Sequence, residues 1–179
     1  MINVIPNIAA VGDQESQGKR IYNKIYVILD DDIDYDKLPE ITVTDEARTC
    51  AALTLKPGKK WAEINFAKNT AGRTSEGSQG DITTAVTNTL TGTVGGHRIE
   101  IDNFLENFVG RPVHVVEVDR FTQKKYLLSR PYSPMFVSAF SGRKNADNTS
   151  TDITFSNESF FQPLEYLGSV TEAAAAAAE

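Results

Sequence analysis

The stretch His97–Ser129, HRIEIDNFLENFVGRPVHVVEVDRFTQKKYLLS, predicts a short helix, a sharp stop and a hairpin. Gly110 can adopt the left-handed backbone conformation that ends helices, and Pro112 prevents the helix from restarting. Apolar side chains before this stop have the spacing i, i+3, i+4 and i+7 that gives a helix one apolar face, at Ile101, Phe104, Leu105 and Phe108. We therefore expect one α-helix at about residues 98–109.

A valine-rich run follows the helix at residues 112–119. Its apolar residues fall on both faces of an extended chain, which is typical of a strand covered on both sides. Residues 119–124 have the composition of a turn, and Lys125–Ser129 returns as a partner strand. Because so short a helix is not stable alone, we expect its apolar face to pack on this hairpin.

Further strands are expected on both sides of this stretch. Trp61–Ala67 and Met135–Ser141 alternate apolar and polar residues, and Phe136, Ser138 and Phe140 share one side of the second segment. Strand runs without intervening helices favour a sandwich or barrel over an α/β fold. The fold class is therefore mainly β, an antiparallel β-sandwich or partial barrel with one flanking short helix. Other strands are expected at residues 25–29 and 152–157.

A single domain over residues 1–170 accounts for these elements. We expect an N-terminal arm at residues 1–24, whose apolar residues pack on its own domain rather than on a neighbour. The apolar segment at residues 160–167 must pack on its own core or on another chain. The alanine-rich end, residues 171–179, is either a short helix or a disordered tail.

Composition limits the function. The chain has 179 residues and a formal net charge of −6, so it is not built to neutralise phosphate. Its one cysteine, Cys50, excludes an internal disulfide and a cysteine-based zinc site. No apolar run is long enough to cross a bilayer. We expect a soluble protein, made in a reducing cytoplasm and without a membrane partner.

The sequence contains two possible chemical sites. Asp32-x-Asp34-x-Asp36 resembles the opening of an EF-hand loop, but Lys37 and Val43 stand where that loop needs Gly and Glu. A solvated acidic loop is the better interpretation, and we expect no metal. His97 and His114 are the only candidate general bases near neutral pH, and neither has a nucleophile in a suitable context. We expect no catalytic residue and no cofactor, and we interpret His114 as a buried, satisfied residue.

Residues 68–94 divide into two contrasting parts. Lys68–Gly80 has no large apolar residue and predicts a long loop, which is either a hairpin tip that orders against another chain or a plain surface loop. Asp81–Val94 predicts a strand with Val86, Leu90 and Val94 on one face. Its other face is small and hydroxylated and carries no positive charge.

The order of these features resembles the tail tube (major tail) proteins of bacteriophages. The likeness covers about Thr49 to Leu167: a long loop in a hairpin, a polar strand, Gly-Gly, a helix ending Phe-Val-Gly-Arg-Pro, a valine strand, an Asp-Arg-x-Thr turn and a Lys-Tyr-Leu-Leu strand. The ending Thr-Asp-Ile-Thr-Phe-Ser-Asn-Glu-Ser, followed by Pro-Leu-Glu-Tyr, resembles the last core strand and trailing segment. In that family, β-sandwiches with a flanking helix form hexameric rings that stack into a tube for DNA.

The resemblance implies a structural virion protein of the tail, made in the host cytoplasm and without enzymatic activity. Its partners would be copies of itself, other tail or connector proteins, and DNA that passes without sticking. Strands 81–94 and 61–67 would lie in the lumen-lining sheet, with lining residues Asp81, Thr83, Ala85, Thr87, Thr89 and Thr91. The loop would reach an adjacent ring through Lys68, Gly72, Arg73, Glu76, Gly77 and Gly80, and both terminal segments would add contacts.

Two other classes of function stay open. One is another virion or secretion-system ring protein, such as a tail terminator, a head–tail connector, a capsid accessory protein or an effector-tube ring. The other is an enzyme or carbohydrate-binding module built on a sandwich, which would need a concave pocket lined by convergent polar groups.

Overall fold

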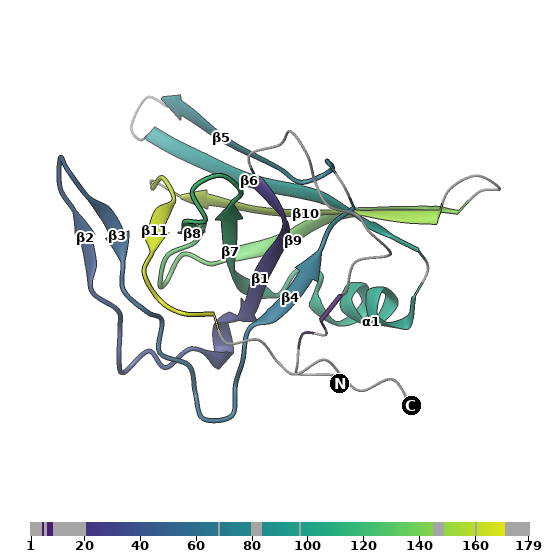
Figure 1. Cartoon of the computed structure of the whole chain (residues 1–179), viewed down its shortest axis with the longest axis horizontal. Coiled ribbons are helices and arrows are strands. Elements are labelled where there is room, and N and C mark those ends of the chain that lie inside the picture. Colours follow the sequence, from purple (N-terminus) through teal and green to yellow (C-terminus); the bar gives the residue numbers. More distant parts are fainter. Residues whose placement is uncertain are drawn as a thin grey trace.

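The structure is a computed structural model that describes residues 5, 7–8, 21–67, 69–79, 84–96, 98–144, 149–159 and 161–170. The described chain is mainly β with one short α-helix, which confirms the predicted fold class (Figure 1). The helical elements are η1 (Asp30–Asp32), a single 3-10 turn, and α1 (Ile99–Phe108). The strands are β1 (Ile21–Leu29), β2 (Ile41–Val43), β3 (Arg48–Cys50), β4 (Ala62–Asn65), β5 (Gly72–Gln79), β6 (Thr84–Gly95), β7 (Pro112–Asp119), β8 (Lys125–Leu127), β9 (Met135–Lys144), β10 (Thr149–Ser159) and β11 (Leu164–Tyr166).

The strands pair in the order β2-β3-β11-β8-β7-β9-β10-β6-β5, and β1 joins β7 to β4. Neighbouring strands are antiparallel, apart from the parallel pair β3 and β11. The main core lies between two layers: β6, β9 and β10 supply one wall, and β1, β4 and β7 supply the other. The molecule is therefore sandwich-like, with α1 adding side chains to the same core.

Strand β7 is covered on both faces, as the valine run predicted. Val113 and Val115 point into the main core, whereas Val116 and Val118 belong to a second apolar cluster. That cluster lies on the other side of β1 and β7 and includes Trp61, which is buried and meets the ring of Tyr166 edge-on with the centroids 6.1 Å apart. The chain thus builds an apolar core on each side of one central strand pair.

Helix α1 agrees closely with the expected span. Ile101, Phe104 and Phe108 are buried, and Gly110 has the left-handed φ of +79° that ends the helix. The Phe104 ring stacks on Phe108 at 5.6 Å and lies 6.4 Å from the Phe155 ring of β10. The helix is therefore fixed by the core that it shares with β7 and β10.

Both terminal segments pack on their own chain wherever they are described. Ile5 and Ile8 are buried in the main core, and the Ile8 amide donates to the carbonyl oxygen of Glu63 at 2.8 Å. The expected N-terminal arm is too long, because β1 already starts at Ile21, opposite Asp119 of β7. Near the other end, β11 lies between β3 and β8. The alanine-rich residues 171–179 lie outside the described residues.

The long loop expected at residues 68–80 is wrong for most of its length, because Gly72–Gln79 forms strand β5. This strand pairs with β6 from Gly72 opposite Thr91 to Gln79 opposite Thr84. An edge strand needs only backbone partners on one side, so small and polar side chains suffice and leave no apolar alternation to detect. Lys68 and Gly80 lie outside the described residues.

The expected alternation in β9 is wrong, because this strand contains a β-bulge. Thr154 pairs with Ala139 but Phe155 pairs with Val137, which leaves Ser138 as the extra residue. Since an extra residue reverses the parity of a strand, Phe136 and Phe140 lie on opposite faces instead of sharing one. Phe140 is opposite the buried Ile153 and therefore lies on the side of α1.

Candidate functional site

Strand β6 has the two different faces that the sequence predicted. Its even-numbered residues Val86, Asn88, Leu90 and Val94 are buried, whereas Ala85, Thr87, Thr89, Thr91 and Thr93 are half-buried or exposed. Asp81 and Thr83, the first two expected lining residues, lie outside the described residues.

The neighbouring strands continue the outer face of β6 in register. Thr89 lies between Thr74 of β5 and Ser156 of β10, and Thr91 lies between Gly72 and Thr154. We call this surface the hydroxyl face, and its residues are Gly72, Thr74, Glu76, Ala85, Thr87, Thr89, Thr91, Thr93, Asp152, Thr154, Ser156 and Glu158. The long ribbons of the antiparallel strands β5, β6 and β10 carry it, in the upper part of Figure 1.

The charge of the hydroxyl face is acidic. Its charged members are Glu76, Asp152 and Glu158, and its defined positions include no lysine or arginine. Glu76 and Glu158 are the register partners of Thr87 on either side, so their backbones are about 10 Å apart, two strand spacings. The neighbouring strand β9 carries a cation on the same side of the sheet, since Arg143 is the register partner of Ser150 and lies 3.7 Å from Asp152. Surface carboxylates and hydroxyls repel or ignore phosphate, because they offer no cation to replace its counterions.

Buried contacts fix the inner side of the same strands. Asn88 is fully buried and bonds to the Ser75 hydroxyl at 2.7 Å, and its amide donates to the carbonyl oxygen of Phe161 at 3.0 Å. Gly92 lies against Phe66, whose ring would be 2.4 Å from a Cβ added at that position. The sequence predicted which face of the strand these residues share with Val86, Leu90 and Val94, but not these partners.

Phe66 follows β4 where the chain crosses to β6, because the amide of the next residue, Ala67, donates to the carbonyl oxygen of Thr93 at 2.6 Å. The expectation that residues 61–67 line the same sheet as β6 is wrong for β4, which pairs with β1 in the opposite layer. The β4 side chains of Ala62 and Ile64 are buried in the main core. An alternating segment fits either layer of a sandwich equally well, so its sequence pattern did not distinguish them.

Arg73 also differs from its expected role. It was expected to reach an adjacent ring, but it pairs with Leu90 in register, faces inward and forms an ion pair with Glu117 of β7. Glu117 is only 3% exposed, and its Oε2 has no hydrogen-bond partner among the described residues. Burial raises the pKa of Glu117 to about 7, against the opposing effect of the Arg73 charge. Glu76 and Gly77 of β5 are exposed.

A chain of buried polar groups explains His114. Its Nδ1 is 2.7 Å from the Ser129 hydroxyl, its Nε2 is 2.7 Å from Asp30 Oδ1, and the Tyr35 hydroxyl donates to the same carboxylate oxygen. The hydrogen bond from His114 is the main cause that lowers the pKa of Asp30. Because Ser129 is 1% exposed, no substrate can reach its hydroxyl, and the group is structural. His97 lies outside the described residues.

The acidic loop after β1 is held by cations of the same chain. Lys59 Nζ is 2.8 Å from Asp32, Lys37 Nζ is 3.6 Å from Asp34, and Arg111 is 3.7 Å from Asp31. Within the described ranges, no group of three or more His, Cys, Asp or Glu side chains is placed to hold a metal ion. The loop is therefore an ion-paired surface segment.

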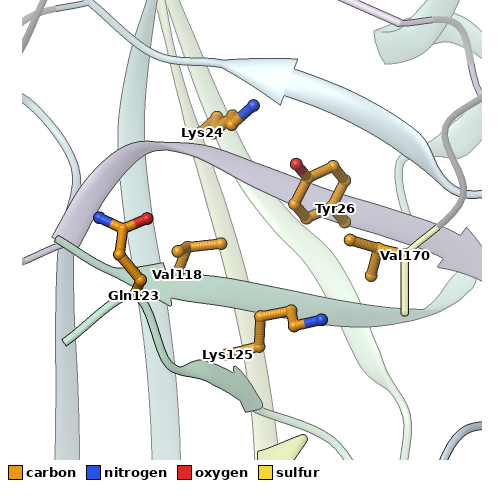
Figure 2. A pocket seen from close by; sticks show the side chains of 6 residues that line it. All are labelled: Lys24, Tyr26, Val118, Gln123, Lys125 and Val170. Carbon is orange, nitrogen blue, oxygen red and sulfur yellow. The ribbon is translucent and has the colours of Figure 1, made fainter. Parts of the chain in front are cut away.

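A cleft of about 390 Å³ lies between β1, β7 and β8. Figure 2 shows two lysines, Lys24 and Lys125, on opposite sides of it, with Tyr26 and Gln123 nearby. Lys24 Nζ is 3.2 Å from a Glu63 carboxylate oxygen, and Lys125 Nζ donates to the carbonyl oxygen of Gly168 at 2.6 Å. Both ammonium groups already have partners, so the cleft is a weak candidate for binding an anion.

A scan against protein-family models and a search of curated proteins both gave no match. Among the helices that the described residues form, none is long and apolar enough to cross a membrane.

Proposed function

We propose that this chain is a structural subunit of a bacteriophage tail tube. Its copies would form rings, hexameric by the resemblance, that stack around a channel for DNA. The observation that carries the proposal is the hydroxyl face, a continuous three-strand surface of small hydroxylated side chains with three carboxylates and no cation at its defined positions.

Such a surface suits the inside of a DNA channel. Each lysine or arginine that contacts phosphate releases counterions and adds binding free energy, and a ring repeats every contact in each subunit. A lining of threonine with a few carboxylates offers DNA no such source of binding free energy. DNA could then slide past without being gripped.

Open strand edges support assembly into rings. Within the part of the chain that the structure describes, β5 pairs only with β6, and β9 pairs with β7 only at Met135 and Phe136. Natural proteins cover long edges, since exposed backbone groups invite pairing with another chain. We propose that neighbouring copies cover the free edges of β5 and β9.

The remaining biological setting follows from this role. The subunit would be made in the host cytoplasm and end in the virion tail, with copies of itself and other tail or connector proteins as partners. It would need no cofactor and would catalyse no reaction.

Negative-stain electron microscopy of the purified chain tests the proposal, together with sedimentation velocity at high protein concentration. We expect rings or tubes with a central channel. Closed rings that never stack would favour a tail terminator or connector instead. A protein that stays monomeric at high concentration and in virion-like salt would contradict both roles.

A further inference from the structure

A large aromatic side chain is held in solvent at the turn between β7 and β8. Phe121 is 71% exposed. The turn beneath it is fixed, because Asp119 Oδ1 accepts hydrogen bonds from the amides of Phe121 and Thr122, both at 3.0 Å. The Gln123 amide also donates to the Asp119 carbonyl oxygen at 2.9 Å. A preorganised aromatic group loses little conformational entropy when it binds, so it makes an efficient anchor.

The flanks of this turn are basic. We call residues 120–124 the aromatic turn, and it carries Arg120 and Lys124 beside Phe121. Lys124 Nζ is 2.9 Å from Glu165 of the same chain. Arg120 is half-buried, and its Nη1 is buried without a hydrogen-bond partner among the described residues. The surface that receives this turn should therefore be apolar at its centre and acidic at its rim.

A cleft with that chemistry lies between α1 and β9. It measures about 320 Å³ and is lined by Asp102, Leu105, Glu106 and Phe140. We call it the helix groove. Phe140 is 52% exposed and lies there because of the bulge at Ser138, while Leu105 is only partly buried. Glu106 is exposed at the rim.

We infer that the aromatic turn of one copy of this chain binds in the helix groove of a second copy. Phe121 would lie between Leu105 and Phe140, and Arg120 would face Glu106 and Asp102. The apolar centre of the turn would meet the apolar centre of the groove, and the basic residues of the turn would meet the acidic residues of the groove. This complementarity favours one orientation of the two copies over others.

One copy cannot fill its own groove. In Figure 1, α1 lies to the right of the β1–β4 pair, whereas β8 and the turn that precedes it lie to the left. The contact is therefore head-to-tail, with different surfaces on the two copies, and such contacts close into rings or extend as filaments. The inference rests on the proposed function in one respect, because it names the surfaces by which subunits of a ring would meet.

Two single variants and their mixture test the contact by sedimentation velocity. Phe121→Ser removes the anchor and keeps the groove, whereas Glu106→Arg alters the groove and keeps the anchor. We expect each variant alone to associate at least about tenfold more weakly than the wild type, as for loss of a central anchor. An equimolar mixture should form a 1:1 dimer that cannot grow through this contact, because it retains one intact turn and one intact groove.

Ile99→Ser is the matched control, because Ile99 is equally exposed at 71% and lies on α1 outside the groove. Circular dichroism melting checks that every variant folds. A double variant, Arg120→Glu with Glu106→Arg, should recover association that Arg120→Glu alone loses. Wild-type association by Phe121→Ser, or no 1:1 dimer from the mixture, would overturn the contact.

These results separate the contact from the proposed function. Normal tubes from Phe121→Ser would overturn the contact and leave the tail tube role standing. Wild-type dimers or rings that need Phe121 but never form tubes would support the contact and contradict the tail tube role.

Discussion

Arg73 and Glu117 form an ion pair that joins the edge strand β5 to the central strand β7. The groups around Glu117 are Arg73 from β5, Asp119 from β7 itself and Tyr126 from β8, and its register partner on β1 is the apolar Ile25. Burial is the largest influence on the Glu117 carboxyl and raises its pKa from 4.5 to about 7.

Stability should therefore depend on pH. A carboxyl whose pKa is raised in the folded state binds its proton more tightly there than in the unfolded chain. The stability that this adds is fully present below pH 4.5 and is lost as pH rises through about 7. We expect urea titrations to show a loss of about 2 to 3 kcal/mol over that window, and Glu117→Gln to remove most of the slope.

Arg73→Met tests the partner of the same pair. Without the guanidinium, an ionised Glu117 is buried with no countercharge, so we expect about 3 kcal/mol of destabilisation at pH 8. The loss should shrink at pH 5, where Glu117 is protonated. Equal destabilisation at both pH values would show that Arg73 acts by packing rather than by charge.

A methyl group added at Gly92 should destabilise the folded protein. Gly92→Ala would place a Cβ 2.4 Å from the Phe66 ring, so the ring or the β6 backbone must shift. We expect a loss of about 1 to 3 kcal/mol in chemical denaturation, which is typical of overpacking in a core. Gly77→Ala is the control, since no atom lies within 4 Å of a Cβ built there. Equal stabilities of the two variants would contradict the tight packing of Phe66 on β6.

If the proposed tail tube role is correct, cations placed on the hydroxyl face should make the channel lining bind DNA. Thr89→Lys lies between Thr74 and Ser156 and keeps its charge free for phosphate, whereas Thr87→Lys lies between Glu76 and Glu158, which offset it. We expect tubes of both variants to assemble, and Thr89→Lys tubes to bind DNA more tightly and with a steeper salt dependence. DNA binding to assembled tubes, titrated in salt, measures the difference.

Leu90→Lys is the folding control for that comparison. Leu90 is fully buried, so a lysine there buries an unpaired charge and should prevent folding. Normal folding of Leu90→Lys together with failure of Thr89→Lys to fold would mean that the two faces of β6 are exchanged. Equal DNA binding by the two threonine variants would contradict the role of Glu76 and Glu158.

The Ser129, His114 and Asp30 chain should contribute stability and no reactivity. Ser129→Ala removes one hydrogen bond to His114 and should cost about 1 kcal/mol in thermal or chemical denaturation. A fluorophosphonate reagent, which modifies activated serines, should leave Ser129 unlabelled in mass spectra of the folded protein, because that hydroxyl is buried. Specific labelling of Ser129 would contradict the structural role.

Much of this fold could be predicted from local periodicity in the sequence. Phe104 and Phe108 repeat at helical spacing, and Val115 and Val116 lie side by side in a run with no polar face, so α1 and the two-sided β7 were predictable. The same was true of β6, where parity alone separated Leu90 from Thr89.

The incorrect predictions concern the pairing of strands and of distant side chains, which the local sequence pattern does not encode. Strand β5 has no apolar face, and its strand conformation depends on the backbone of β6. The bulge at Ser138 becomes visible only when β9 is aligned with β10, and it moves Phe140 to the helix groove. Glu117 was visible as an interruption of the valine run, but its partner Arg73 is 44 residues away, at a distance no periodicity describes.

The position of β11 also sets the order in which this protein can complete its fold during synthesis. β11 lies between β3 and β8, and Leu164 and Tyr166 supply side chains to the second apolar cluster. Chains emerge from the ribosome N-terminus first, so this cluster lacks two of its members until residues 164–166 have been released. A nascent chain therefore carries an incomplete core until residues 164–166 have been released, and its stable form is reached only then.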